Sequence, residues 1–187
     1  MKPISFSSII VIVFTFFAGP ALAANYKIDT EGQHAFVTFR VGHLGYSFIV
    51  GGFNEFEGRF SHDAGNPAAS KVSVTIDARS LDTNHAERDK HLRSADFLDV
   101  DSYPTITFES SGYVSGLDGD KLKGNLTMLG VTRAIEIDVR HIGEGKDPWG
   151  GYRSGFQGNV TLNSADFGIP QWVGDVEVEL NIEGVRI

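Results

Sequence analysis

Strict alternation of apolar and polar residues is the feature of this chain that most constrains its fold. Residues 72–77 read Val-Ser-Val-Thr-Ile-Asp, and residues 175–183 read Asp-Val-Glu-Val-Glu-Leu-Asn-Ile-Glu. Successive side chains of a β-strand point to opposite faces, so each segment predicts a strand with one buried and one solvated face. Segments 121–128 and 135–140 alternate in the same way. This pattern is typical of antiparallel sheets.

Weaker strand patterns occupy much of the remaining chain, at residues 26–29, 35–41, 47–60, 105–113 and 153–162. The segment 47–60 changes phase, because Ile49 and Phe53 share one parity whereas Phe56 and Phe60 share the other. A bulge near Asn54 would reconcile the two phases and bend the strand. Sequential strands with turn-like connections favour an all-β fold, a closed antiparallel barrel of about eight strands with one surface helix. Closure removes the unprotected edges that an open sheet would have.

The inward positions of such a barrel combine phenylalanines with glycines such as Gly51, Gly58 and Gly124. A barrel of about eight strands has an interior wide enough for one small ligand. The same composition also fits a solid core, in which phenylalanines fill the space and glycines relieve curvature. If a cavity is present, we expect apolar side chains from most strands to line it: Phe39, Phe53, Phe56, Val74, Ile76, Phe108, Leu126, Val160, Val178 and Leu180.

The N-terminal segment does not belong to the predicted barrel. Lys2 precedes an apolar run over residues 9–17 that is too short to span a membrane, and residues 21–23 read Ala-Leu-Ala, a pattern that signal peptidase accepts. Residues 1–23 are therefore predicted to be a cleaved signal peptide, and residues 24–187 a single domain. The absence of cysteine fits the periplasm of a bacterium.

The charge of the predicted domain limits its partners. Without Lys2, 15 of the 16 basic residues remain against 24 acidic ones, a net charge of −9. Such an excess of negative charge argues against nucleic acid and against adsorption to anionic membrane surfaces. Transient membrane contact and a homodimer both stay open.

One strongly polar segment, residues 82–94, interrupts the strands. Asn84 followed by Glu87 matches a capping box of the Asn type, which predicts a helix over residues 85–93. This helix is too polar to belong to a core, so we expect it on the surface or across the barrel mouth.

Four side chains are candidates to meet the polar headgroup of a ligand at that mouth: His43, Arg88, His91 and Arg93. An Arg guanidinium suits a pyrophosphate or a carbonyl group because it donates hydrogen bonds in pairs. The alternative is a solvated helix with local ion pairs such as Glu87–Lys90.

The chain carries no recognisable catalytic or metal-binding motif. It has no cysteine, no GxSxG or HExxH sequence and no glycine-rich phosphate loop. His85 and His91 are six residues apart and would lie on different faces of a helix. We therefore expect a protein that is not an enzyme and uses no metal or cofactor. The competing hypothesis is an enzyme acting on an amphiphile, with His43 or His91 as general base.

Several motifs resemble those of the YceI-like proteins. The most specific is residues 83–98, followed by Tyr103-Pro-Thr-Ile-Thr-Phe108. Others are Gly32-Gln-His-Ala-Phe36, His43-Leu-Gly-Tyr-Ser47, the glycine and phenylalanine pattern of residues 51–58, Gly124-Asn-Leu-Thr-Met-Leu-Gly-Val-Thr132, residues 147–156 and Asp166-Phe-Gly-Ile169.

The resemblance implies a lipocalin-like barrel that encloses a polyisoprenoid chain, such as a prenyl pyrophosphate or the tail of a quinone. It also implies a periplasmic protein without established catalytic activity, associated with stress responses. A ligand-free interaction barrel acting in envelope stress is the alternative, and it would have an interior filled by side chains.

Overall fold

The computed structural model describes residues 23–187, which form a sheet of 11 antiparallel strands and one α-helix, α1 (Ala86–Arg93). The strands are β1 (Ala24–Ile28), β2 (Phe36–His43), β3 (Ser47–Phe53), β4 (Phe56–His62), β5 (Lys71–Asp77), β6 (Leu81–Asp82), β7 (Thr105–Val114), β8 (Asp120–Met128), β9 (Val131–Lys146), β10 (Tyr152–Asn163) and β11 (Asp175–Arg186). Short 3-10 turns lie at Pro67–Ala69, Ala78–Ser80, Ser164–Phe167 and Gln171–Val173.

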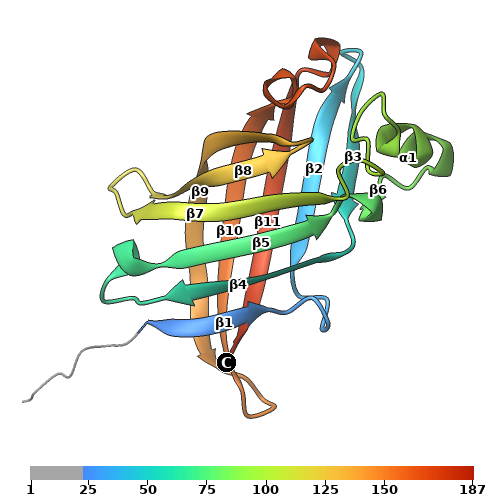
Figure 1. The fold of residues 1–187 in the computed structure, drawn as a ribbon. Coiled ribbons are helices and arrows are strands. Elements are labelled where there is room, and N and C mark those ends of the chain that lie inside the picture. The colour runs from blue at the N-terminus through green and yellow to red at the C-terminus, as the bar shows by residue number, and fades with distance from the viewer. Residues whose placement is uncertain (1–22) are drawn as a thin grey trace, which may run out of the picture.

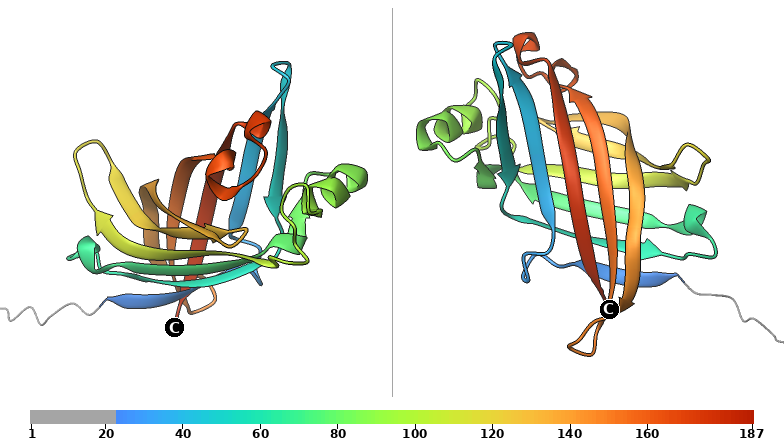
Figure 2. Two further views of the ribbon diagram at one scale, coloured as in Figure 1. Left: turned by 45° about the horizontal axis from the view of Figure 1, so that its top comes forward. Right: turned by 180° about the vertical axis from the view of Figure 1, so that it is seen from behind.

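Eight of these strands form a closed ring in the order β1-β4-β5-β7-β8-β9-β10-β11, which the pairing of β1 with β11 completes (Figure 1). The remaining strands extend the wall from β11, because β2 pairs with β11, β3 with β2, and β6 with β3. This ring confirms the predicted closed antiparallel barrel. Two walls face each other in this barrel. The strands of one wall, β9, β10, β11, β2 and β3, run at a steep angle to those of the other, β1, β4, β5 and β7 (Figure 2).

Two long strands of the wall are each divided into a pair of shorter ones. The phase change predicted in residues 47–60 is a complete break at Asn54 and Glu55, where β3 ends and β4 begins. Here β3 pairs with β2, whereas β4 pairs with β1 and β5. β5 and β6 are separated in the same way by the turn over Ala78–Ser80. The two-residue strand β6 was not predicted, since so short a segment has no visible alternation.

The connections between the strands define two ends of the barrel. At one end lie the β2–β3 hairpin, α1, the β8–β9 turn and residues 164–174, and we call it the α1 end (Figure 2). At the opposite end lie residues 63–70, 115–119 and 147–151, which join β4 to β5, β7 to β8 and β9 to β10.

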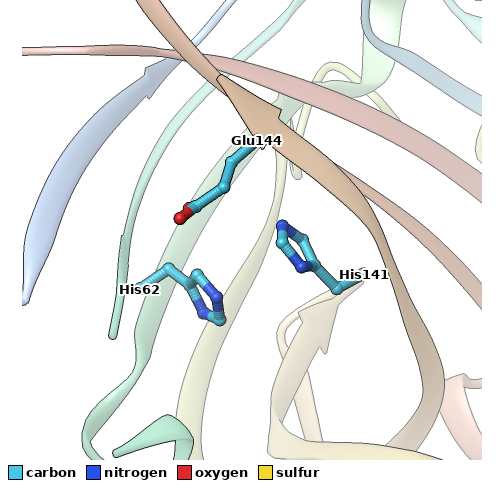
Figure 3. A group of neighbouring side chains, drawn as sticks. All are labelled: His62, His141 and Glu144. Atoms are coloured by element: carbon cyan, nitrogen blue, oxygen red, sulfur yellow. The ribbon is translucent and has the colours of Figure 1, made fainter. Parts of the chain in front are cut away.

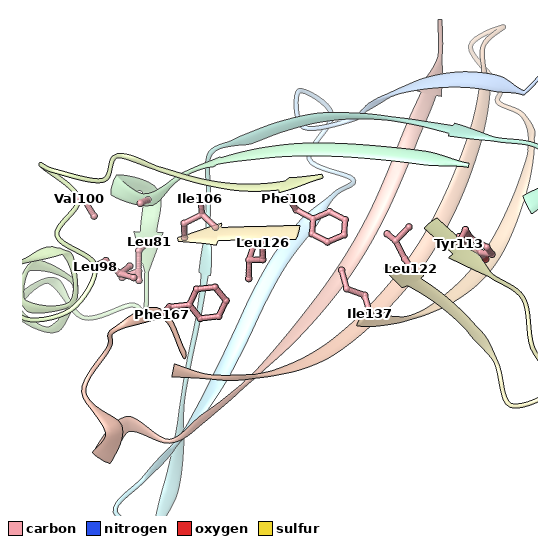
Figure 4. Close-up of a cluster of buried hydrophobic side chains, with 11 residues drawn as sticks. Leu81, Leu98, Val100, Ile106, Phe108, Tyr113, Leu122, Leu126, Ile137 and Phe167 are labelled. Atoms are coloured by element: carbon pink, nitrogen blue, oxygen red, sulfur yellow. The ribbon is translucent and has the colours of Figure 1, made fainter. Parts of the chain in front are cut away.

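The core is the inner face of the barrel. Its largest buried cluster runs from beside α1 across β7, β8 and β9, and it consists of Ala78, Leu81, Leu98, Val100, Ile106, Phe108, Tyr113, Leu122, Leu126, Ile137 and Phe167 (Figure 4). A second cluster of Tyr26, Ile28, Ala35 and Phe60 lies against β1 and β4. Alternate residues of β7 and β8 supply Ile106, Phe108, Leu122 and Leu126, as the period of two predicts.

The predicted signal peptide lies outside the described residues, apart from Ala23. Among the residues that are described, no helix is long and apolar enough to cross a membrane.

Candidate ligand-binding cavity

A cavity of about 540 Å³ occupies the interior of the barrel. Its lining extends from Leu44 and Trp172 at the α1 end to His62 and Ser70 at the opposite end, and most of the side chains between them are aliphatic or aromatic. Pockets that bury small ligands have volumes of about 300–1,000 Å³ and mainly apolar walls. The alternative of a solid-cored barrel is therefore wrong.

All but one of the predicted lining residues face this cavity: Phe39, Phe53, Val74, Ile76, Phe108, Leu126, Val160, Val178 and Leu180. Their contact with a ligand stays a prediction. The exception is Phe56, which is absent from the lining. It directly follows the break between β3 and β4, and it packs against the second buried cluster. It has the same parity as Phe60, which lines the cavity, so the prediction is wrong in how far the lining extends along β4 and not in parity.

The cavity reaches solvent at the α1 end, where several of its lining residues are exposed. Leu44 in the β2–β3 hairpin is 77% exposed, and Trp172 in the β10–β11 connection is 78% exposed. His43 and His91 are also exposed there and line the cavity. The His91 ring packs edge-on against Phe97, and its Nε2 lies 3.4 Å from an Asp96 oxygen. Among the described residues, Glu87 forms no ion pair with Lys90, and His91 lies beside Asp96.

Arg88 lines the cavity, but most of its guanidinium is already engaged by the protein. Its Nε donates to Thr83 Oγ1 at 2.6 Å, and its Nη2 donates to the Thr83 carbonyl oxygen at 2.7 Å. Thr83 in turn donates to Asp89 Oδ1 from its backbone N at 2.9 Å and from its hydroxyl at 2.5 Å. These bonds fasten α1 to the chain that precedes it.

The buried carboxylate of Asp89 is the centre of this attachment. Burial alone would raise the pKa of Asp89, but the hydrogen bonds from Thr83 and the charge of Arg93 lower the pKa below its usual value. The carboxylate therefore stays ionised where it can accept both hydrogen bonds.

Arg93 does not reach the cavity, so its predicted place at the mouth is wrong. Its Nη2 donates to the carbonyl oxygen of Leu81, and its side chain lines a separate polar pocket with Asp82, His85 and Asp89. As the last residue of α1, it faces back toward β6.

The helix cap also differs from the prediction by one residue. His85 is the N-cap, and its Nδ1 accepts a hydrogen bond from the Arg88 backbone N at 3.2 Å. Asn84 has a left-handed backbone with φ of 59°, and its N donates to Asp82 Oδ1. Asn tolerates this conformation better than most residues, so Asn84 turns the chain into the helix instead of capping it.

Aromatic and histidine rings pack together at the opposite end of the cavity. Tyr26 stacks on Phe60 with a centroid distance of 4.8 Å, and Phe156 packs edge-on against Phe60 at 5.5 Å. The rings of His62 and His141 lie within 5.2 Å and 4.7 Å of Phe156, respectively. Sequence reasoning missed these histidines as a pair, because they are far apart in the chain and carry no motif.

An ionic network ties the strands together at this end. Arg153 of β10 lies 2.5 Å from oxygens of Asp29 and Glu183 and 2.9 Å from an oxygen of Asp147. Hydrogen bonds from His34 and then from Arg153 lower the pKa of Asp29 to about 2. The network joins β10 and β11 to the loops that follow β1 and β9.

Comparison with known proteins places this architecture in a family. The model of the YceI-like domain matches residues 26–185. A UPF0312 protein of Pseudomonas aeruginosa is 55% identical over 175 residues, which cover 91% of this chain and 92% of that protein.

Two solved structures share the fold. The Campylobacter jejuni YceI protein has 28% sequence identity and a TM-score of 0.68, covering 78% of this chain and 89% of its own. A polyisoprenoid binding domain from Saccharophagus degradans has 14% identity and a TM-score of 0.62, covering 89% of this chain and 100% of its own, so it is similar in fold alone. The family match spans nearly all of the described barrel, and the chain belongs to the YceI-like family.

Proposed function

We propose that this protein binds a long apolar lipid, with a polyisoprenoid or quinone-type tail, inside its barrel and carries it through the periplasm. The observation that carries the proposal is the cavity of about 540 Å³, whose mainly apolar lining runs from the α1 end to the opposite end. An elongated apolar space suits a chain-like ligand better than a compact polar one.

The energetics of burial favour such a ligand. Transfer of one isoprene unit from water into an apolar space contributes roughly 3–4 kcal/mol, at about 0.8 kcal/mol for each carbon-sized group. A few units outweigh the cost of association, which is roughly 4–15 kcal/mol. Affinity then increases with the length of the tail, and the headgroup contributes mainly to selectivity.

The open α1 end is the place for the headgroup. His43, Arg88 and His91 line the cavity there, and Arg88 retains one guanidinium nitrogen beyond those that bind Thr83. A family neighbour described as a polyisoprenoid binding domain supports the ligand class. The predicted signal peptide supports the compartment.

The proposal can be tested by native mass spectrometry of the protein isolated from its own cells, followed by solvent extraction of the ligand. We expect a stoichiometric prenyl lipid or quinone. A protein that is isolated empty and takes up no prenyl lipid from detergent would contradict the proposal.

A variant pair locates the ligand. Leu126→Glu places a carboxylate on the inner wall, so it should abolish lipid retention, whereas Ala134→Glu on the exposed face of β9 should retain lipid. Val160→Trp fills the same cavity without a charge and should displace the lipid even if Leu126→Glu fails to fold. A folded Leu126→Glu or Val160→Trp protein that keeps its lipid would place the ligand elsewhere.

A further inference from the structure

Three side chains with metal-binding atoms converge at the closed end of the barrel. They are His62 at the end of β4 and His141 and Glu144 in β9, and their ligand atoms all lie within 4.8 Å of one another (Figure 3). In the ring of eight strands, three strands separate β4 from β9 in either direction. The cluster therefore spans the interior between opposite walls.

A β-bulge brings the two β9 residues onto the same face. His141 and Glu144 are three residues apart, so in a regular strand they would point to opposite faces. In the pairing of β9 with β10, Phe156 is opposite His141 and Gly155 is opposite Gly143, which leaves Ile142 as an extra residue. The exposed side chain of Ile142 points outward, and both His141 and Glu144 turn toward His62 (Figure 3). Bulges of this kind commonly re-aim side chains at functional sites.

The buried ring of His62 is the second observation that points to a ligand. Its side chain is only 7% exposed, and neither Nδ1 nor Nε2 has a hydrogen-bond partner among the described residues. Buried polar atoms are normally paired, because an unpaired one loses its hydrogen bonds to water without replacement. Both ring nitrogens of His62 are therefore available to a ligand.

A buried hydroxyl group orients one of the other two ligands. His141 Nε2 lies 3.2 Å from the hydroxyl oxygen of Ser154, which is itself buried. Contacts of this kind, from groups behind the ligands, fix the orientation of metal-binding side chains.

A second cluster of similar composition serves as a comparison. Asp29, His34 and Glu183 also bring their ligand atoms within 4.8 Å, but the Arg153 guanidinium already contacts both carboxylates. No Lys or Arg in residues 23–187 forms such an ion pair with Glu144. Arg153 therefore already supplies a cation to the cluster of Asp29, His34 and Glu183, whereas no Lys or Arg of the described residues pairs with Glu144 in the cluster with His62 and His141.

From these contacts we infer that His62, His141 and Glu144 bind a divalent transition metal ion of the Zn²⁺ class at the closed end of the cavity. Two imidazoles and one carboxylate suit such ions, which take four ligands in a tetrahedral arrangement. Ligands of tetrahedral zinc lie about 3.4 Å apart, so the side chains need to close by only about 1 Å. The bound ion joins the two opposite walls of the barrel.

The test is titration of tag-free, metal-free protein with ZnCl₂ by calorimetry, with the visible absorption of Co²⁺ as an independent report of coordination. We expect one equivalent to bind. His62→Phe and Glu144→Gln should each weaken binding by about 100-fold or more, since each removes a direct ligand and even outer-shell changes cost 10–100-fold. His34→Gln, in the comparison cluster, should leave stoichiometry and affinity unchanged.

His62→Phe also separates loss of the metal from loss of the fold. It replaces the unpaired ring by an apolar one among Phe156 and its neighbours, so we expect a barrel at least as stable as the unchanged protein. Failure to bind Zn²⁺ at 100 µM, or binding that survives both His62→Phe and Glu144→Gln, would overturn the inference. Binding that disappears in His34→Gln would also overturn it, because the ion would then lie in the other cluster.

Discussion

The two ends of the cavity are built from the same strands but differ in how their side chains meet solvent. At the α1 end, exposed residues such as Leu44 and Trp172 line the cavity itself. At the opposite end, the exposed Leu117 and Trp149 do not line it, and the lining residues His62 and Ser70 are buried. We infer that one end gives access to the interior, whereas the other contributes closure and stability.

The largest effect is expected at the closed end. Arg153→Met leaves the largely buried carboxylates of Asp29 and Asp147 without their cation, which should lower the free energy of unfolding by about 3–5 kcal/mol. Urea denaturation measures this loss. Arg140→Met is the matched control, since Arg140 is exposed and bonds only Gln157 and should cost less than about 1 kcal/mol. Equal losses of unfolding free energy in both variants would show that the ionic network of Arg153 contributes no more to stability than an exposed arginine does.

Acid should weaken the same network. The folded pKa of Asp29 is about 2, below its ordinary value of 3.8, so its contribution is fully present above pH 4 and is lost as the pH falls through 2. The expected loss is on the order of 2 kcal/mol. Urea denaturation at a series of pH values measures it. His34→Gln should flatten this dependence because His34 contributes most to the shift; an unchanged acid profile in that variant would contradict the assignment.

At the α1 end the expected effect on stability is smaller and local. Asp89→Ala removes the acceptor of both Thr83 hydrogen bonds and should cost about 1–2 kcal/mol. Hydrogen exchange should accelerate in α1 while the amides of β7–β10 stay protected, because α1 packs outside the closed ring. Asp96→Asn, at an exposed carboxylate, is the control. Global acceleration of exchange would show that α1 belongs to the same cooperative unit as the barrel.

The smallest effect on stability is expected from a pair of exposed leucines. Leu44→Ser and Leu117→Ser should each change the free energy of unfolding by less than about 0.5 kcal/mol. If lipid passes through the α1 end, Leu44→Ser should slow uptake of a prenyl lipid from neutral vesicles several-fold, whereas Leu117→Ser at the opposite end should not. Equal rates of lipid uptake in the two variants would show that lipid does not enter selectively at the α1 end.

Sequence reasoning identified the strand faces well because side-chain direction in a strand depends only on parity. Val74, Phe108 and Leu180 were placed inside the barrel on that basis, and they line the cavity. The same reasoning did not show that Phe56, the first residue of β4, lies outside the lining. It also failed at Arg93, because the direction of a helix side chain depends on how the helix docks.

The sequence by itself therefore determined that the chain is an antiparallel barrel with an apolar interior, and its motifs indicated the family. Only the tertiary structure decided that the interior is hollow, since the same phenylalanines and glycines could have filled it. Only the structure brought His62 to His141 and Glu144, because a meeting across opposite walls depends on ring closure and on a bulge of one residue. Parity is a local property of the chain, whereas the approach of distant side chains is set by strand register and closure.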